Sequence, residues 1–254
     1  MTTACVRERD QDTSTATDYL LGDMAFNDAI SLAEDAYTKA TGDNLSNYKT
    51  TGYCAKITHV KTSIPHTILV DFDTLNCLCN DARYRRGKVM ISYTGNSLFE
   101  AGSDIMVTFD NYYIDNNLVK GLVFAKQKGL NVDNQPYMDI QVEGKILKPT
   151  SVDTIYWNAN RTRTVLQGGT TAQWEDDIYE FVGTTTGRNS LLGYFAANIT
   201  KPVLKTTLCR YFYQGEVEIQ PQGHTMRTIL LGEGNCDKET VVQIDNKNFS
   251  VSQF

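Results

Sequence analysis

The cysteines carry the most distinctive chemistry of this 254-residue chain, which contains six of them. Cys54 opens a strand-like run and Cys77 follows in an Asn-Cys turn, and Cys209 and Cys236 repeat this arrangement. Both units read as a strand, a Pro-containing turn, a strand with Thr-Ile, and the Asn-Cys turn. This repetition predicts two disulfide-stapled hairpins, Cys54–Cys77 and Cys209–Cys236. Such bonds persist in oxidising compartments, so the pattern favours a location outside the cytoplasm.

Cys79 is left over and leaves alternatives open. It is an alternative partner for Cys54 in place of Cys77, and the cysteines can also be reduced thiols of a protein core. A zinc site is disfavoured because Cys77-Leu78-Cys79 is not the usual C-x₂₋₄-C spacing of zinc ligands. We therefore expect disulfides and no metal at these positions.

The beginning of the chain suggests lipid attachment. A small residue, Ala4, precedes Cys5, and a polar stretch follows it. This looks like the junction at which a bacterial lipoprotein is acylated on its cysteine. The start lacks a charged segment and an apolar segment, so we expect no complete signal peptide within this sequence. The alternative is an ordinary cytosolic start with an incidental cysteine.

A tryptophan and two arginines form the candidate ligand-binding surface. Side chains alternate along a strand, so Trp157, Arg161 and Arg163 project from one face. Trp beside Arg offers a stacking platform with hydrogen-bond donors for an anionic or sugar ligand. The alternative is that Trp157 covers the core while the arginines pair with acidic residues at 175–177.

Carboxylates provide two weaker candidate sites, one for calcium binding and one for glycoside hydrolysis. Asp71, Asp73 and Asp81 crowd a turn with oxygen atoms of the kind that calcium prefers, although Asp also forms such turns without metal. Glu216 and Glu218 share one strand face, as a pair of carboxylates in a glycoside hydrolase would. Solvated acidic residues explain this pair equally well. Because the motifs of nucleophilic, zinc and nucleotide chemistry are lacking, we expect no enzyme and no cofactor.

The composition argues against two classes of interaction, namely nucleic-acid binding and a membrane-spanning helix. A net charge of −6 argues against nucleic acid, whose binding requires a basic surface. No apolar run approaches the roughly 20 residues that a membrane-spanning helix needs.

The elements that position these residues are mostly strands. We expect a polar tether up to residue 17, then one domain over 18–254. Phe26, Ile30, Ala33 and Tyr37 recur with helical period, which predicts an amphipathic helix over 18–41 that begins at Asp18 and ends before Gly42. Extended segments separated by turn signals follow: 88–93, 105–109, 118–124, 137–142, 152–166, 177–186, 193–200, 207–219, 225–231, 239–244 and 247–253. Short connections make neighbouring strands antiparallel, so the prediction is a mainly β protein with a long antiparallel meander, either an open curved sheet or a sandwich.

Several strings give the sequence a family likeness. They are Asn76-Cys77-Leu78-Cys79-Asn80-Asp81, Arg83-Tyr84-Arg85-Arg86-Gly87-Lys88, Phe109-Asp110-Asn111-Tyr112-Tyr113, Trp157-Asn158 and Gly232-Glu233-Gly234-Asn235-Cys236-Asp237. Together they resemble a group of uncharacterised lipoproteins common in Bacteroidota, over nearly the whole chain. The resemblance implies export, a lipidated cysteine, and an outer-membrane or cell-surface location, exposed to the periplasm or the exterior. It implies no activity.

The expected function is therefore a non-catalytic binding module of the cell envelope. Its expected partners are the membrane, through the lipid on Cys5, and an unknown envelope or glycan ligand. The alternatives are a structural protein that forms a homo-oligomer by pairing of β edges, and, less favoured, a glycoside hydrolase.

Overall fold

The computed structural model describes residues 10–42, 54–149, 153–169, 176–189, 191 and 193–254. One helix, α1 (Ser14–Thr41), is followed by fourteen strands. Their bounds are β1 Lys56–Val60, β2 His66–Asp71, β3 Cys77–Leu78, β4 Tyr84–Tyr93, β5 Asp104–Ile114, β6 Asn117–Leu130, β7 Pro136–Leu147, β8 Thr154–Gln167, β9 Ile178–Asn189, β10 Gly193–Thr206, β11 Gln214–Pro221, β12 Arg227–Glu233, β13 Glu239–Ile244 and β14 Lys247–Ser252. The fold is mainly β, as predicted.

All strands belong to one antiparallel sheet whose order follows the chain from β1 to β14, with short β3 paired beside β4. The predicted meander is confirmed, and the sheet is open rather than a sandwich. Hairpin turns set the register, as at Asp245-Asn246, where both residues have positive φ (49° and 60°) in the predicted tight turn. The segment predicted as a strand from residue 207 becomes a strand only at Gln214, because a turn around Cys209 precedes it.

The helix ends where the sequence predicts, at Gly42, whose φ of 88° is the left-handed conformation that favours glycine. It begins at Ser14, earlier than the predicted Asp18, so residues 14–17 are helical rather than part of a tether. Asp18 does not cap the helix, because its side chain is buried and pairs with Lys148. Residues 1–9, including Cys5, lie outside the described residues.

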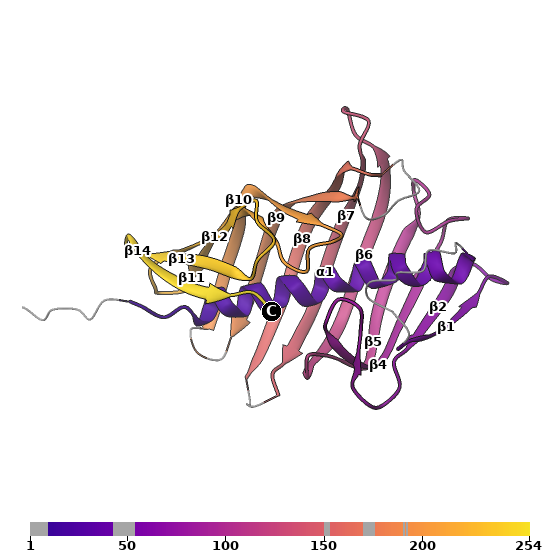
Figure 1. The fold of residues 1–254 in the computed structure, drawn as a ribbon, viewed down its shortest axis with the longest axis horizontal. Helices are drawn as coiled ribbons and strands as arrows, with labels where there is room; N and C mark the ends of the chain where they lie inside the picture. Colours follow the sequence, from indigo (N-terminus) through magenta and orange to yellow (C-terminus); the bar gives the residue numbers. More distant parts are fainter. Residues whose placement is uncertain (1–9, 43–53, 150–152, 170–175, 190, 192) are drawn as a thin grey trace, which may run out of the picture.

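The sheet curls around α1. Figure 1 shows the helix running across the middle strands, while β11, β13 and β14 lie on the viewer's side of its N-terminal half. One core results, in which helix side chains such as Leu20 and Leu32 share a cluster with Val123, Val217 and Val242. Because the sheet surrounds the helix, α1 is buried on nearly all sides between Thr15 and Ala33, with Thr17, Asn27 and Ser31 only half-buried. The predicted apolar stripe accounts for only part of this burial.

Candidate functional site

The tryptophan and arginines of β8 share one face, as predicted, but that face lies beneath α1. Trp157 is 1% exposed, and its ring packs against the rings of Tyr19 and Phe26 on the helix, with centroids 5.2 and 6.3 Å away. Arg161 and Arg163 are each 5% exposed. The predicted stacking platform is therefore wrong, because the helix covers these three side chains.

The carboxylates that pair with the two arginines come from the helix, and β9 contributes Thr185, which accepts a hydrogen bond from Arg161 at 2.6 Å. Arg161 donates hydrogen bonds to the Tyr19 hydroxyl (2.6 Å) and approaches Asp23 at 3.4 Å. Arg163 pairs with Glu34, one nitrogen donating at 2.9 Å, and lies over the ring of Tyr179. The alternative interpretation is correct for Trp157, and the ion pairs of the arginines are formed with Asp23 and Glu34 of α1. Asp177 also attracts Arg163 electrostatically, and Glu175 lies outside the described residues.

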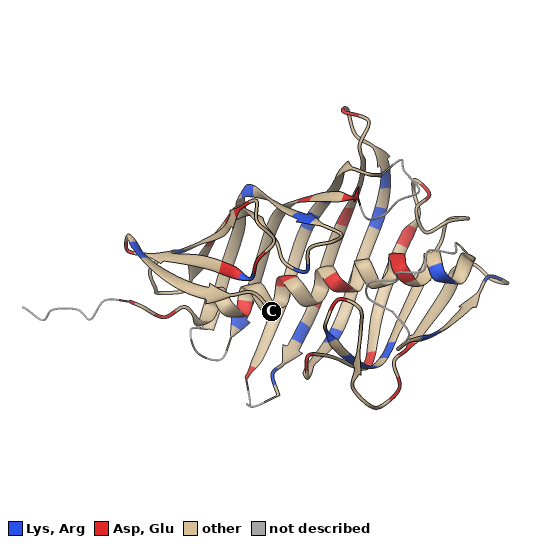
Figure 2. Ribbon diagram, in the orientation of Figure 1, with Lys and Arg blue, Asp and Glu red and all other residues tan. Residues whose placement is uncertain are grey.

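These pairs belong to a longer series along the helix. Figure 2 shows acidic positions recurring along α1 and basic positions on strands behind it. Lys148 pairs with Asp18, and Arg227, with a completely buried side chain, pairs at 2.8 Å with Asp10 in the segment just before the helix. Buried charges need such partners, because an unpaired buried charge is costly. The acidic side of α1 thus faces basic side chains of the sheet.

Burial and pairing shift the pKa values of the helix carboxyls in both directions. Burial raises the pKa of Asp23 and of Asp18 above the ordinary value, despite Arg161 and Lys148 beside them. Burial also acts on Asp28, but Arg85 and Arg83 outweigh it, so the pKa of Asp28 lies below the ordinary value.

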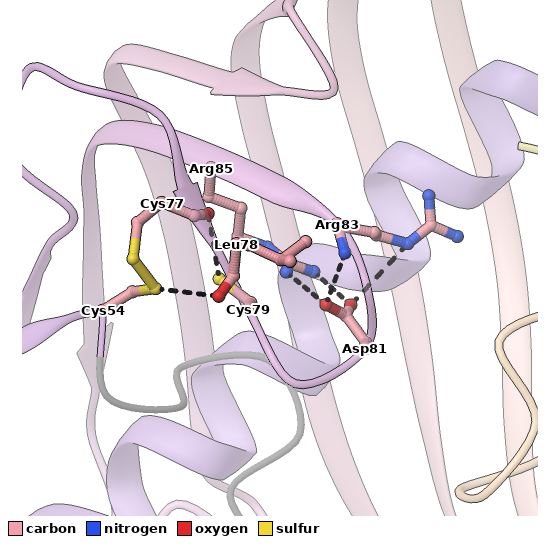
Figure 3. Close-up of a disulfide and its surroundings, with 7 residues drawn as sticks. All are labelled: Cys54, Cys77, Leu78, Cys79, Asp81, Arg83 and Arg85. Carbon is pink, nitrogen blue, oxygen red and sulfur yellow. Dashed lines mark hydrogen bonds and ion pairs between the residues drawn. A yellow bond between two sulfur atoms is a disulfide. The ribbon is translucent and has the colours of Figure 1, made fainter.

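The predicted N-terminal disulfide is confirmed. Figure 3 shows the bond between Cys54 and Cys77, whose Cα atoms are 5.7 Å apart. Among the cysteines that the structure describes, Cys79 is the one outside a disulfide, and it is buried. Burial raises the pKa of its thiol, which keeps the thiol protonated and therefore poorly nucleophilic. A reactive cysteine is not favoured at this position.

Beside this disulfide lies a buried charge cluster, the Arg85 cluster (Arg85, Asp28, Asp81 and Tyr112). The two terminal nitrogens of Arg85 donate to the two carboxylate oxygens of Asp81 at 2.7 and 2.6 Å, and one of them also donates to Asp28 at 2.6 Å. Its Nε donates to the Tyr112 hydroxyl at 3.2 Å. Figure 3 shows Asp81 pointing toward Arg83 and Arg85.

This cluster overturns the calcium hypothesis. The oxygens of Asp81 are engaged by Arg85, whereas Asp71 pairs with Lys88 at 3.1 Å and accepts a hydrogen bond from the backbone N–H of Asp73. Within the described part of the chain, no three His, Cys, Asp or Glu side chains gather as a metal site would require. The crowding of acids in the sequence reflects turns and ion pairs.

The second predicted disulfide, Cys209–Cys236, is also confirmed, with Cα atoms 5.7 Å apart. The turn that holds Cys209 contacts the N-terminal disulfide region. Arg210 donates to the Ala82 carbonyl at 3.0 Å and pairs with Asp115, while Arg83 donates to the carbonyl of Phe254 at 2.8 Å. We call these contacts of Arg83 and Arg210 the clasp.

A cleft opens where the strands from β8 to β14 bend, with a volume of about 780 Å³. A volume of this size falls in the range of ligand sites. Its apolar side chains are Leu166, Pro202, Leu204, Leu230 and Val241. Its charged side chains are Glu180, Lys201, Glu216, Glu233 and Glu239.

Strand register explains how these residues meet. Directly paired residues project from the same face of a sheet. Glu180 pairs with Leu204, Leu204 with Gln214, and Gln214 with Glu233, which forms one row across four strands. Glu216, Leu230 and Val241 form a second row.

The two rows face away from the helix. The neighbours of the second row, Val217, Ile229 and Val242, are completely buried in the core. Because side chains alternate along a strand, the cleft lies on the opposite face of the sheet.

The carboxylates of the cleft differ in their partners. Glu216 pairs with Lys201 at 2.7 Å, and the hydrogen bond from Lys201 lowers its pKa. A general acid needs a raised pKa, so this shift does not favour the predicted pairing of Glu216 and Glu218 in glycoside hydrolysis. Among the described residues, no lysine or arginine forms an ion pair with Glu180, Glu233 or Glu239.

Sequence reasoning missed the cleft entirely. Its residues come from seven segments between Leu166 and Ser250, and they are brought together by bends and shifts in strand register, such as the shift between Lys201 and Leu204. No motif marks such a site. The only sequence signal is the outward alternation of polar residues in β11 and β13.

No protein family, curated protein or solved structure matches this chain. None of the helices that the structure describes is long and apolar enough to cross a membrane. The two disulfides indicate an oxidising location outside the cytoplasm.

Proposed function

We propose that this chain is a non-catalytic binding module of the cell envelope, and that the cleft is its binding site. The cleft is the observation that supports the proposal. It combines an apolar surface with three carboxylates, Glu180, Glu233 and Glu239, that form no ion pair among the described residues, on a face of the sheet that the helix leaves open. The rest of the sheet, held by buried ion pairs and two disulfides, would serve as a rigid support.

The proposal includes a lipid anchor on Cys5 at the outer membrane or cell surface. The small residue before Cys5, the likeness to Bacteroidota lipoproteins and the oxidising location support it. Metabolic labelling with an alkyne-tagged palmitate should mark the protein in its native cell, and Cys5→Ser should abolish both the label and membrane association. A labelled Cys5→Ser variant would contradict the anchor.

Ligand binding is tested separately, with the purified protein and fractionated envelope extract. Hydrogen exchange should slow in residues 200–206, 214–216 and 228–241 when a ligand is present. Leu230→Glu should remove this protection, since it places a charge on the apolar surface. Met106→Glu is the matched control, because Met106 is an exposed apolar residue on β5, outside the cleft. Protection that survives Leu230→Glu, or that never occurs, would refute the proposed binding site.

A second candidate is a structural protein that assembles through its sheet edges. The observation that favours it is the open sheet, in which β1 and β14 each pair with one neighbouring strand among the described residues. Such edges can pair with another chain. Static light scattering that gives only the monomer mass at high concentration would eliminate this candidate.

A further inference from the structure

We propose that the cleft binds a basic, extended peptide segment of another protein, with two cationic side chains on either side of an aliphatic one. This inference rests on the proposed function and names its ligand class. Charge is the first argument. Four glutamates line the cleft against one lysine, and that lysine is already paired with Glu216. An anionic ligand would meet uncompensated like charge.

The spacing of the carboxylates is the second argument. Glu180 and Glu233 lie at the two ends of a row that crosses from β9 to β12, with Leu204 and Gln214 between them. Three strand spacings separate them by about 14 Å, which exceeds the reach of one small amine. In an extended peptide, residues i and i+4 lie on one side about 13 Å apart. Two lysines at that spacing match the two carboxylates, and residue i+2 then lies between Leu204 and Gln214.

The chemistry of the lining disfavours a sugar. No aromatic side chain is present among the described residues that line the cleft, whereas sugar rings are commonly bound by stacking on such side chains. Aliphatic side chains instead suit the apolar part of a peptide.

Fluorescence anisotropy with three labelled peptides tests the proposal. The basic probe is acetyl-Lys-Ser-Leu-Ser-Lys-amide, and the controls are acetyl-Glu-Ser-Leu-Ser-Glu-amide and acetyl-Lys-Leu-Lys-Ser-Ser-amide, in which the lysines are too close. The basic probe should bind most tightly, and its affinity should fall with added salt. Equal or tighter binding of the acidic peptide would overturn the proposal.

Variants locate the binding. Glu180→Gln and Glu233→Gln should each weaken binding of the basic probe by about two- to five-fold, the range expected for an exposed ion pair. Glu218→Gln is the matched control, since Glu218 lies on β11 outside the cleft, and it should leave the affinity unchanged. Equal effects of all three variants would overturn the assignment of the two carboxylates.

The proposal and the proposed function can fail separately. If envelope extract protects the cleft from exchange while no basic peptide binds, the ligand class is wrong and the binding site stands. If neither occurs, both are wrong.

Discussion

Arg85 of β4 links the helix to the sheet through hydrogen-bonded ion pairs. Its side chain is completely buried, and it donates to carboxylates from two separate segments, Asp28 on α1 and Asp81 in the turn before β4. Burial lowers the pKa of Arg85, but Asp28, Tyr112 and Asp81 outweigh the burial, so the guanidinium remains protonated. Removing this one charge would leave two buried carboxylates without their main partner.

Arg85→Met is therefore expected to destabilise the protein strongly. The free energy of unfolding should fall by about 3–5 kcal/mol, the cost typical of breaking a buried ion pair from one side. Urea unfolding followed by circular dichroism measures this change. Arg188→Met is the control, because Arg188 lies exposed on β9 and should change stability by about 0.5 kcal/mol or less. Similar losses for the two variants would show that the Arg85 cluster contributes no special stability.

Asp177 offers a test of pH dependence. Burial raises the pKa of its carboxyl to about 6, with the hydrogen bond from Tyr179 opposing the rise. A group whose pKa is higher in the folded state contributes stability at low pH, and this contribution is lost as the pH rises through the folded value. Stability from Asp177 is thus present below pH 4 and lost by pH 7.

We expect the NMR signal of the Asp177 carboxyl to titrate with a midpoint near 6. We also expect Asp177→Asn to stabilise the protein more at pH 8 than at pH 4, relative to the wild type, because the variant never carries the charge. Tyr179→Phe should raise the midpoint further, since it removes the hydrogen bond to the charged form. A midpoint near the ordinary Asp value, or a stabilisation that is the same at both pH values, would contradict the burial argument.

At the scale of elements, the helix depends on close contact with β8. Gly22 faces Trp157, and a Cβ atom at this position would lie 2.4 Å from the indole ring. Alanine is the better helix former by about 1 kcal/mol. The ring is held between Tyr19, Phe26 and Phe195, so it has little room to shift.

Gly22→Ala is expected to destabilise the protein by about 1–3 kcal/mol despite its higher helix propensity, because overpacking outweighs propensity. Ser31→Ala is the control in the same helix, at a half-buried position, and should be nearly neutral. Thermal unfolding of both variants tests the difference. If Gly22→Ala raised the melting temperature, the contact between α1 and Trp157 would be looser than the structure indicates.

The elements also separate what the sequence could and could not predict. The strands and the two disulfides follow from local signals, namely turn residues, alternation and the repeated cysteine units. The start of the helix was missed because Thr15 and Ala16 lack an apolar pattern and are buried only by the curl of the sheet. Trp157 and Arg161 were placed on the correct face, but their covering helix comes from a distant part of the chain. The cleft requires the register of many strands at once, which no local pattern contains.

At the scale of the whole molecule, the clasp joins the two ends of the long sheet. The turn at Cys209 follows β10, and the turn at Ala82 and Arg83 precedes β4, yet Arg210 donates to the Ala82 carbonyl and Arg83 donates to Phe254. Each disulfide therefore supports a turn that takes part in the same contact. If the two ends of the sheet made no contact, the loss of one disulfide would destabilise only the hairpin that contains it.

The clasp predicts that the two disulfide regions are coupled. Cys209→Ala combined with Cys236→Ala should speed amide exchange in residues 77–83 as well as around residue 209, because Arg210 would lose its fixed position. Arg210→Ala should produce the same effect at 77–83 with both disulfides intact. We expect exchange there to be about ten-fold faster or more, since a hydrogen bond to a charged group contributes about 1.5–3 kcal/mol.

Hydrogen exchange with mass spectrometry measures this coupling, and Arg188→Ala is the matched control because it removes an exposed arginine outside the clasp. If residues 77–83 kept their protection in the cysteine variant, the two ends of the sheet would be independent. Faster exchange in Asp28 and its neighbours on α1 would extend the argument, because Arg83 also lowers the pKa of Asp28. Opening the clasp would then loosen the helix as well, and the two staples would hold the curl of the sheet around α1 rather than two separate hairpins.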